Sequence, residues 1–261
     1  MLPSALLVGA ALAVPPTPSG RTCSVLDAFN RVATMPLQPL SPKHCAALDR
    51  GETVTLIQEG PDGHPRAIGL ARTGLPKNNL WIASQDPHFS GEDLIEAPLQ
   101  VRPHDSIWYG MLEIPRPFSN RHWVIHSTDN SALMASSEGR FCEHPWTVEN
   151  ERLPEVRAKV EAGTVPGLDL DHFDKAMATP VNEGALVFLD IGARDSLYLY
   201  HVTTDIGGMV PERVVAGYLR STMGEHIRGI VERARQLIPR HYRGDHPPLH
   251  DCGDSTVPLF D

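Results

Sequence analysis

The chain has 261 residues, of which 41% are hydrophobic, and a formal net charge of -9. This length allows one large core with additional segments rather than two equal domains. An acidic chain is a poor partner for a polyanion, so we predict no nucleic-acid partner. The sequence has no P-loop and no GxGxxG, and no apolar run of the roughly 18 residues that a membrane-spanning helix needs. We predict no cofactor and no bound metal.

The first 19 residues form a leader. Ala5 to Val14 make a short apolar run that includes Ala-Leu-Ala near its end, and a Pro-rich stretch follows it. This resembles a signal peptide cleaved near Ala13, although no basic residue precedes the run. Two interpretations stay open: export to the periplasm or the extracellular space, or a cytoplasmic protein with an apolar tail.

Four cysteines, Cys23, Cys45, Cys142 and Cys252, allow three disulfide pairings. We favour Cys23 with Cys45, which flank an N-terminal helical stretch, and Cys142 with Cys252, which would hold the C-terminal tail. Free buried thiols in a reducing compartment are the alternative. A metal site is disfavoured because no CxxC or paired Cys/His spacing is present.

After the N-terminal helical segment, 20–50, the chain alternates short strands and turns. A Pro-Asp-Gly turn joins two strands, which is typical of a hairpin. A short helix follows, then three strands whose spacing indicates an antiparallel meander. One more strand and two helical pieces precede the last third of the chain. The expected strands are 51–60, 64–73, 94–102, 106–114, 122–128 and one near 147–150, and the expected helices lie within 76–87, 154–163 and 170–178.

The last third has the strongest pattern. Two apolar strands, 185–191 and 196–204, lead through a Gly-Gly-Pro turn into a long helix, 212–238. Apolar residues recur in this helix at three- and four-residue steps, and charged residues occupy the other side, so one face should be buried. Thr222 and His226 interrupt the apolar side, with Tyr218 at its edge. A polar group in a dry core needs a partner, so these residues bond to neighbouring strands or to a ligand.

Strands followed by one long amphipathic helix predict an α+β fold in which a curved antiparallel sheet wraps around the helix. Three segments together, 106–128, 196–211 and the closing helix, resemble the START domain, the lipid-transfer family within the helix-grip superfamily. The resemblance covers roughly residues 50 to 238. It divides the chain into a leader (1–19), an N-terminal helical segment (20–50), a START-like domain (51–240) and a Pro- and His-rich tail (241–261).

Two short motifs carry this resemblance. The first is a Pro-rich turn before a strand, and the second is an Asp-Pro-Gly-Gly-like loop that leads into the last helix. His122 stands where the family usually has Asp, and Ile206 stands where it has Pro. The matching residues are Pro115, Pro117, Asn120 and Arg121 in the first motif and Asp205, Gly207, Gly208 and Pro211 in the second.

The resemblance implies a tunnel between sheet and helix that holds one lipid, with the Gly-Gly loop and the helix as its gate. Strand alternation groups side chains by face but does not decide which face points inward. Ordinary core packing is the alternative for each lining residue. Arg121 is expected to be structural rather than to bind a headgroup. The predicted ligand-binding residues are Tyr109, Met111, Trp123, Ile125, Ser127, Tyr200, Met209, Val210, Val215, Tyr218, Leu219, Thr222 and His226.

The predicted function is therefore to bind, and to carry or transfer, one hydrophobic molecule such as a phospholipid or sterol, with transient membrane contact. The alternative is an enzyme of the same fold, similar to polyketide cyclases and aromatases, with His226 as acid or base. The absence of GxSxG and HExxH motifs disfavours hydrolases of those types. A ligand-sensing or purely structural module is the third interpretation.

Overall fold

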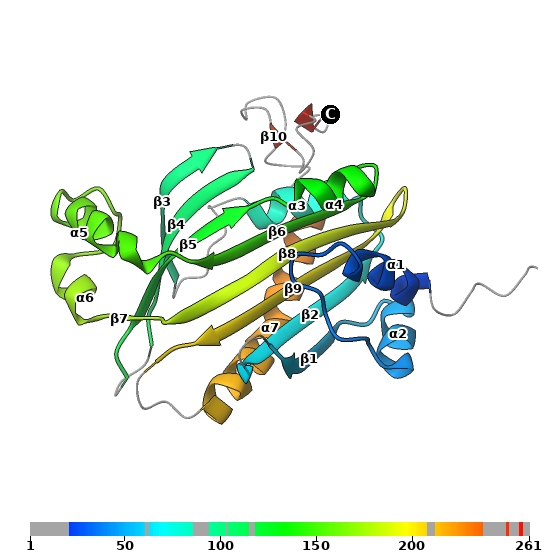
Figure 1. Ribbon diagram of the computed structural model, residues 1–261, viewed down its shortest axis with the longest axis horizontal. Helices are drawn as coiled ribbons and strands as arrows, with labels where there is room; N and C mark the ends of the chain where they lie inside the picture. The colour runs from blue at the N-terminus through cyan, green and yellow to red at the C-terminus, as the bar shows by residue number, and fades with distance from the viewer. Residues whose placement is uncertain are drawn as a thin grey trace, which may run out of the picture.

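The structure is a computed structural model that describes residues 21–60, 63–85, 94–102, 104–114, 118–207, 212–236, 249–250 and 256–257. Figure 1 shows a large twisted sheet with helices on both sides. The helices are α1 (Arg21–Asn30), α2 (Pro42–Asp49), α3 (Lys77–Gln85), α4 (Ser131–Ser136), the 3₁₀ turn η3 (Asn150–Arg152), α5 (Leu153–Glu161), α6 (Leu170–Lys175) and α7 (Glu212–Gln236). The strands are β1 (Val54–Glu59), β2 (Pro65–Thr73), β3 (Leu94–Arg102), β4 (Asp105–Leu112), β5 (Arg121–Thr128), β6 (Phe141–Val148), β7 (Met177–Ala178), β8 (Val181–Gly192), β9 (Asp195–Asp205), β10 (Leu249–His250) and β11 (Thr256–Val257).

The main sheet has nine strands. Eight follow the order β1-β2-β9-β8-β6-β5-β4-β3 with antiparallel pairing, and the short strand β7 pairs with β5 in parallel. Because the first two strands pair with the last, α7 returns to the start of the sheet and packs on β2, β1 and β9. The predicted α+β class with a large antiparallel sheet is confirmed.

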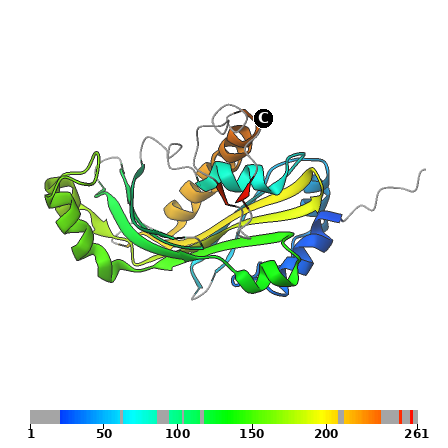
Figure 2. The same ribbon diagram turned by 90° about the horizontal axis from the view of Figure 1, so that it is seen from above.

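Helices cover the two faces of this sheet differently. Figure 2 shows that the sheet is curved, with α3 and α7 on its concave side, whereas α1 and α4 lie on the opposite side and α5 and α6 lie at one end. We call the side with α3 and α7 the helix-side face and the other the outer face. One apolar cluster lies on the helix-side face, and two lie on the outer face, under α1 and α2 and under α5 and α6.

Gly69 on β2 lets α7 approach the sheet. A Cβ atom at this position would lie 2.6 Å from Cγ1 of Ile227 and 2.8 Å from Cγ of Met223. Both of these α7 residues are buried, Met223 at 3% exposure and Ile227 at 0%. The helix therefore rests directly on the backbone of β2, where a larger residue would hold it away.

Cys23 and Cys45 form a disulfide, as predicted, which ties α1 to α2 across 22 residues. Cys142 is disulfide-bonded as well, and its predicted partner, Cys252, lies outside the described residues. Such bonds are consistent with an oxidising compartment. The leader also lies outside the described residues. None of the described helices is long and apolar enough to cross a membrane.

Some elements differ from the sequence-based expectation. The strand expected near 147–150 begins earlier, at Phe141, and the expected strand 185–191 begins at Val181. The short helix α4 was not predicted, whereas α2 lies within the expected N-terminal helical segment, 20–50, which gave it no bounds of its own. Both helices are short, with 8 residues in α2 and 6 in α4, and each is marked mainly by a side-chain cap, Ser41 for α2 and Asn130 for α4.

Candidate ligand-binding site

Strand register assigns the predicted residues of β5 to the helix-side face. Ser127 lies directly opposite Trp146 of β6, and paired residues of an antiparallel ladder share a face. Trp146 belongs to the apolar cluster packed against α3 and α7, and Ile125 packs against the same cluster. By alternation Trp123, Ile125 and Ser127 all point to the helix-side face.

Tyr109 and Met111 of β4 lie on the outer face instead. Their partners in the ladder are Val124 and His122, which alternate with the β5 residues of the helix-side face. Both side chains are 0% exposed and pack in a cluster with residues of α5 and α6. The prediction grouped these two residues with the ligand-binding set, and the register separates them from it. Alternation shows only that two residues share a face, and the helices that cover the outer face were needed to place this pair.

Aromatic rings continue across the helix-side face toward α7. Tyr200 of β9 stacks on Trp146 with ring centroids 5.7 Å apart, and the ring of His226 lies 4.4 Å from that of Tyr200. The indole nitrogen of Trp146 donates a hydrogen bond to Oδ1 of Asn182 at 3.1 Å. Tyr198 stacks on Phe188 of β8 at 5.2 Å. The result is a continuous aromatic surface that ends at a histidine of α7.

His226 makes a hydrogen bond between Nε2 and the hydroxyl of Tyr198, at 3.1 Å. Desolvation by the surrounding protein, with a smaller effect of the Arg233 charge, lowers the pKa of His226 to about 4. The imidazole is therefore neutral at physiological pH. The same side chain is nevertheless exposed to a water-sized probe. His226 is thus desolvated by the surrounding protein and still keeps accessible surface.

The two tyrosines of β9 are also held in their neutral form. Desolvation raises the pKa of Tyr198 well above its usual value, and desolvation, followed by the charge of Glu96, raises that of Tyr200. Tyr198 is 0% exposed, whereas Tyr200 is half-buried. Among the described residues no hydrogen bond to the Tyr200 hydroxyl is found.

A glycine makes room for the indole ring of Trp123. Gly110 of β4 lies opposite Trp123, and a Cβ atom there would lie 2.7 Å from the indole Nε1. The ring therefore lies close to the β4 backbone at Gly110 and is only partly buried. Glu96 of β3 pairs with the same glycine from the other side.

The predicted residues of the last helix are described only in part. Thr222 is half-buried one turn before His226 and takes part in a side-chain interaction. Met209 and Val210 lie outside the described residues. Val215, Tyr218 and Leu219 belong to α7, but their side chains lie outside the described part of the structure.

Arg121 joins two loops at one end of the helix-side face. Its guanidinium donates to the carbonyl oxygens of Ile206 at 2.5 Å and Gly207 at 3.2 Å, at the start of the connection from β9 to α7. It also donates to the carbonyls of Ser119 at 2.5 Å and Asn120 at 3.4 Å. Arg121 is 2% exposed, and burial lowers its pKa. Arg121 therefore connects the start of β5 to the chain that leads from β9 into α7.

A separate polar cluster lies where β5 ends. Asp129 makes hydrogen bonds to Nδ1 of His104 at 2.7 Å and Nδ1 of His144 at 2.5 Å. The His144 ring also contacts the Trp81 ring of α3 edge-on. This cluster ties the β3–β4 turn, β5 and β6 together. In the described part of the chain no group of His, Cys, Asp and Glu is arranged to hold a metal ion.

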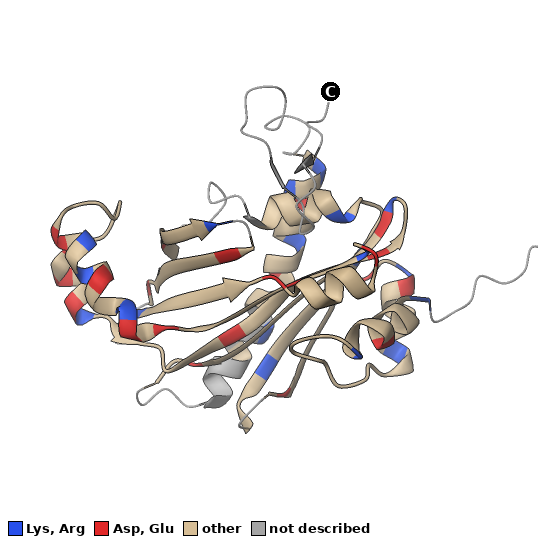
Figure 3. Ribbon diagram, turned by 45° about the horizontal axis from the view of Figure 1, so that its top comes forward, with Lys and Arg blue, Asp and Glu red and all other residues tan. Residues whose placement is uncertain are grey.

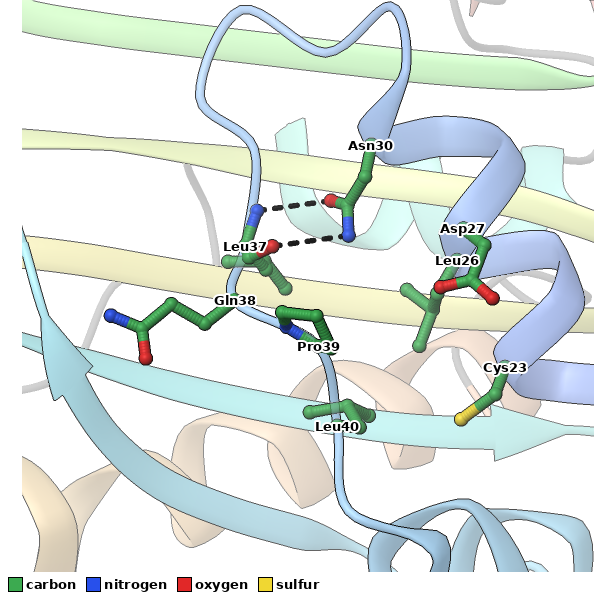
Figure 4. A pocket seen from close by; sticks show the side chains of 8 residues that line it. All are labelled: Cys23, Leu26, Asp27, Asn30, Leu37, Gln38, Pro39 and Leu40. Carbon is green, nitrogen blue, oxygen red and sulfur yellow. Dashed lines mark hydrogen bonds between the residues drawn. The ribbon is translucent and has the colours of Figure 1, made fainter.

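A small pocket of about 140 Å³ lies elsewhere, against α1 (Figure 4). The side chain of Asn30 lines this pocket. Its Nδ2 donates a hydrogen bond to the carbonyl of Leu37, and its Oδ1 accepts one from the Leu37 backbone N–H. Leu26 and Leu37 of this pocket belong to the apolar cluster of the outer face. The pocket is thus distinct from the aromatic surface and shares no residue with it.

Three residues of the aromatic surface were not among the predicted site residues: Trp146, Phe188 and Tyr198. Leu186, which packs against the same cluster, was not predicted either. Tyr198 shares a face with Tyr200 by simple alternation, so the sequence already contained its signal. Trp146 and Leu186 become neighbours of the site only through the pairing of β6 with β8 and β8 with β9.

The sequence matches no protein-family model and no curated protein sequence. The structure is similar to human STARD10, with a TM-score of 0.53 and 10% identity over 71% of this chain and 70% of that chain. A STAR-related lipid transfer protein fragment from Xanthomonas axonopodis gives a TM-score of 0.54 and 15% identity, covering 70% of this chain and 94% of that one. The human StarD13 lipid transfer and protein localization domain gives 0.52 and 15%, covering 71% and 85%.

Proposed function

We propose that this chain, which has the fold of a START domain, binds one hydrophobic molecule between α7 and the aromatic surface of the sheet and carries it between membranes. The fold supports a ligand-binding role, because the similar solved structures include proteins described as lipid transfer proteins. The ligand and the transfer step are our proposal for this chain.

One observation carries the proposal: His226 is accessible to a water-sized probe although the protein around it lowers its pKa to about 4. Partly buried Ile125, Leu186 and Tyr200 adjoin the same apolar cluster. When a ligand covers accessible apolar surface, removing that surface from water contributes about 25 cal/mol per Å² of favourable free energy. Such a surface can therefore hold a hydrophobic molecule with few polar contacts.

The proposed ligand-contacting residues are Trp123, Ile125, Ser127, Tyr200, Thr222 and His226, to which we add Leu186. Trp146 and Tyr198 are buried, and we propose that they position Tyr200 and His226 by ring stacking and by a hydrogen bond. Met209, Val210, Val215, Tyr218 and Leu219 remain proposed members from the sequence. Tyr109 and Met111 are left out because they pack under α5 and α6. Arg121 is proposed to hold the connection into α7 in place.

The enzymatic alternative has one observation in its favour, the hydrogen bond between Tyr198 and His226. A general base works best with a pKa near the working pH. Desolvation holds the pKa of His226 to about 4, which makes the imidazole a weak base at neutral pH. We therefore favour the carrier.

A filled-site variant tests the proposal. We expect the wild-type protein to retain a hydrophobic molecule in native mass spectrometry, to lose it on organic extraction, and to move a fluorescent lipid between vesicles. Ile125→Trp should occupy the accessible space and abolish both activities while the fold persists by circular dichroism. Val101→Trp is the matched control, because Val101 is 64% exposed on the edge strand β3.

Two outcomes would contradict the proposal. One is a wild-type protein that is empty when purified and takes up no lipid from vesicles. The other is an Ile125→Trp variant that binds and transfers lipid as well as the wild type does. A carrier role without catalysis further predicts that the extracted molecule returns unchanged after incubation.

A further inference from the structure

The polar groups that face the proposed ligand space are few. The His226 ring has its Nε2 bonded to Tyr198, and no partner of Nδ1 is found among the described residues. The Tyr200 hydroxyl is likewise without a described hydrogen-bond partner. The two rings lie 4.4 Å apart, and both keep accessible surface. A ligand polar group near both rings could therefore bond to either.

Neither group can supply a positive charge. Desolvation holds His226 in its neutral form at physiological pH, and a phenol is neutral or negative. Whichever tautomer His226 adopts, its Nδ1 offers one donor or one acceptor. A ligand hydroxyl can pair with Nδ1 in either tautomer, because it can both donate and accept. A ligand carbonyl can accept a hydrogen bond from a protonated Nδ1 or from the Tyr200 hydroxyl.

The described cations near this face have other partners. Arg121 donates to four loop carbonyls, and Lys77 of α3 bonds to the carbonyl of Gly139 and to Sγ of Cys142 at 3.4 Å. Arg233, two turns beyond His226 on α7, is also engaged in an interaction, and its charge acts to lower the pKa of His226 and of Tyr198. On the other side of the ligand space, Glu96 contributes negative charge that raises the pKa of Tyr200.

Charged residues are concentrated elsewhere. Figure 3 shows many Lys, Arg, Asp and Glu on α5 and α6, whereas the strands carry few. The charges of those helices pair with one another, as Arg157 does with Asp174 and Lys175 with Asp171. A phosphate or carboxylate buried at the aromatic surface would therefore lose its hydration, and the described cation whose charge reaches His226 and Tyr198, Arg233, lies two turns further along α7.

We infer that the ligand is an uncharged amphiphile whose single hydroxyl or carbonyl lies against His226 and Tyr200, and that anionic lipids are rejected. This inference rests on the proposed function and narrows it. An unpaired buried anion costs several kcal/mol, whereas a neutral hydroxyl with one or two hydrogen bonds costs little. We expect discrimination of at least about 100-fold in Kd between two ligands that differ only in an anionic headgroup.

The test compares 1-monopalmitoylglycerol with palmitoyl lysophosphatidate, which share one chain and differ by a phosphate. Binding to the delipidated full chain is followed by its tryptophan fluorescence, because Trp123 and Trp146 lie on the proposed face. The neutral lipid should bind at least about 100-fold more tightly. Equal binding, or preference for the anionic lipid, overturns this inference and leaves the proposed function standing. Binding of neither lipid overturns both.

Two variants test the polar anchor. His226→Phe keeps ring volume and removes both nitrogens, so affinity for monopalmitoylglycerol should fall about tenfold while affinity for hexadecane, which has no hydroxyl, is unchanged. Tyr200→Phe should likewise weaken binding of monopalmitoylglycerol and leave the affinity for hexadecane unchanged. This second variant keeps the test decisive if His226→Phe does not fold. His126→Phe is the matched control, since His126 of β5 points to the other face and bonds to Asp105. Unchanged affinity in both anchor variants would overturn the assignment of His226 and Tyr200.

Discussion

Two histidine environments show how the two faces of the sheet differ. His226, on the helix-side face, is accessible and hydrogen-bonded to Tyr198. His201, on the outer face of β9, is 0% exposed, and neither of its ring nitrogens has a hydrogen-bond partner within the described part of the chain. Burial lowers both pKa values, to about 4 and about 3. Desolvation alone therefore does not identify a binding residue. Accessible surface together with desolvation separates the proposed site from the sealed core.

The surrounding side chains differ in the same way. The outer face is closed by fully buried aliphatic and aromatic residues under α1, α2, α5 and α6. On the helix-side face, α7 packs on β1, β2 and β9, and side chains of β5 and β8 such as Ile125 and Leu186 are only partly buried. We interpret the outer face as the part that stabilises the fold and the helix-side face as the part left available to a ligand.

The largest expected effect comes from truncating the outer face. Met111→Ala removes a side chain with 0% exposure and should lower the free energy of unfolding by about 2–5 kcal/mol, measured by urea denaturation. Ligand affinity should not change. Ile125→Ala on the helix-side face should lower stability by less than about 2 kcal/mol and should weaken ligand binding. The opposite pattern in this pair would refute the division between the faces.

Next in size is the loss of the Arg121 contacts. Arg121→Met leaves the carbonyls of Ile206 and Gly207 without their donor, and we expect a loss of about 2–3 kcal/mol in unfolding free energy. Arg121→Lys keeps the charge but cannot reach several carbonyls at once, so it should rescue only part of the loss. Hydrogen exchange should increase first near the start of α7. Full rescue by Lys would mean that charge, rather than the forked geometry, matters here.

Acid should destabilise the protein through His201. Burial, followed by the charge of Arg66, lowers the pKa of His201 to about 3, whereas an unfolded histidine titrates near 6.5. Its neutral form is favoured by folding, so stability is complete above the unfolded pKa and falls as the pH drops toward 3. At pH 5 the loss should be on the order of 2 kcal/mol. In the His201→Leu variant the melting temperature should depend less on pH between pH 7 and 5 than in the wild type. An unchanged pH dependence would show that His201 is not responsible.

The smallest expected effect concerns the approach of α7. Gly69→Ala places a Cβ against Ile227 and Met223 and should cost about 1 kcal/mol, because the methionine side chain can move aside. Gly74→Ala is the matched control, since nothing lies within 4 Å of a Cβ at that position. Denaturant midpoints would measure both. Equal midpoints for the two variants would mean that α7 does not press on β2 in solution.

Sequence periodicity was most informative where one element has a single consistent pattern. The apolar steps around Met223, Ile227 and Ile230 located α7 and its buried side. The two strands expected in the 51–73 hairpin correspond to β1 and β2. The pattern did not decide which face Tyr109 and Met111 occupy, because a strand with large residues on both sides has no preferred inward face by alternation alone. In β4, Trp108 and Tyr109 offered two equally apolar faces, and packing against α5 and α6 decided between them.

The amino-acid sequence by itself determined the order of strands and helices, the amphipathic last helix with polar His226 on its apolar side, and the fold they resemble. These follow from local periodicity and turn chemistry, which act over a few residues. Only the tertiary structure decided which face of the sheet α7 covers, that Tyr198 and Tyr200 meet His226, and that His201 is sealed away from it. Those relations depend on strand register and on the pairing of β2 with β9, contacts between residues far apart in the chain that no local pattern specifies.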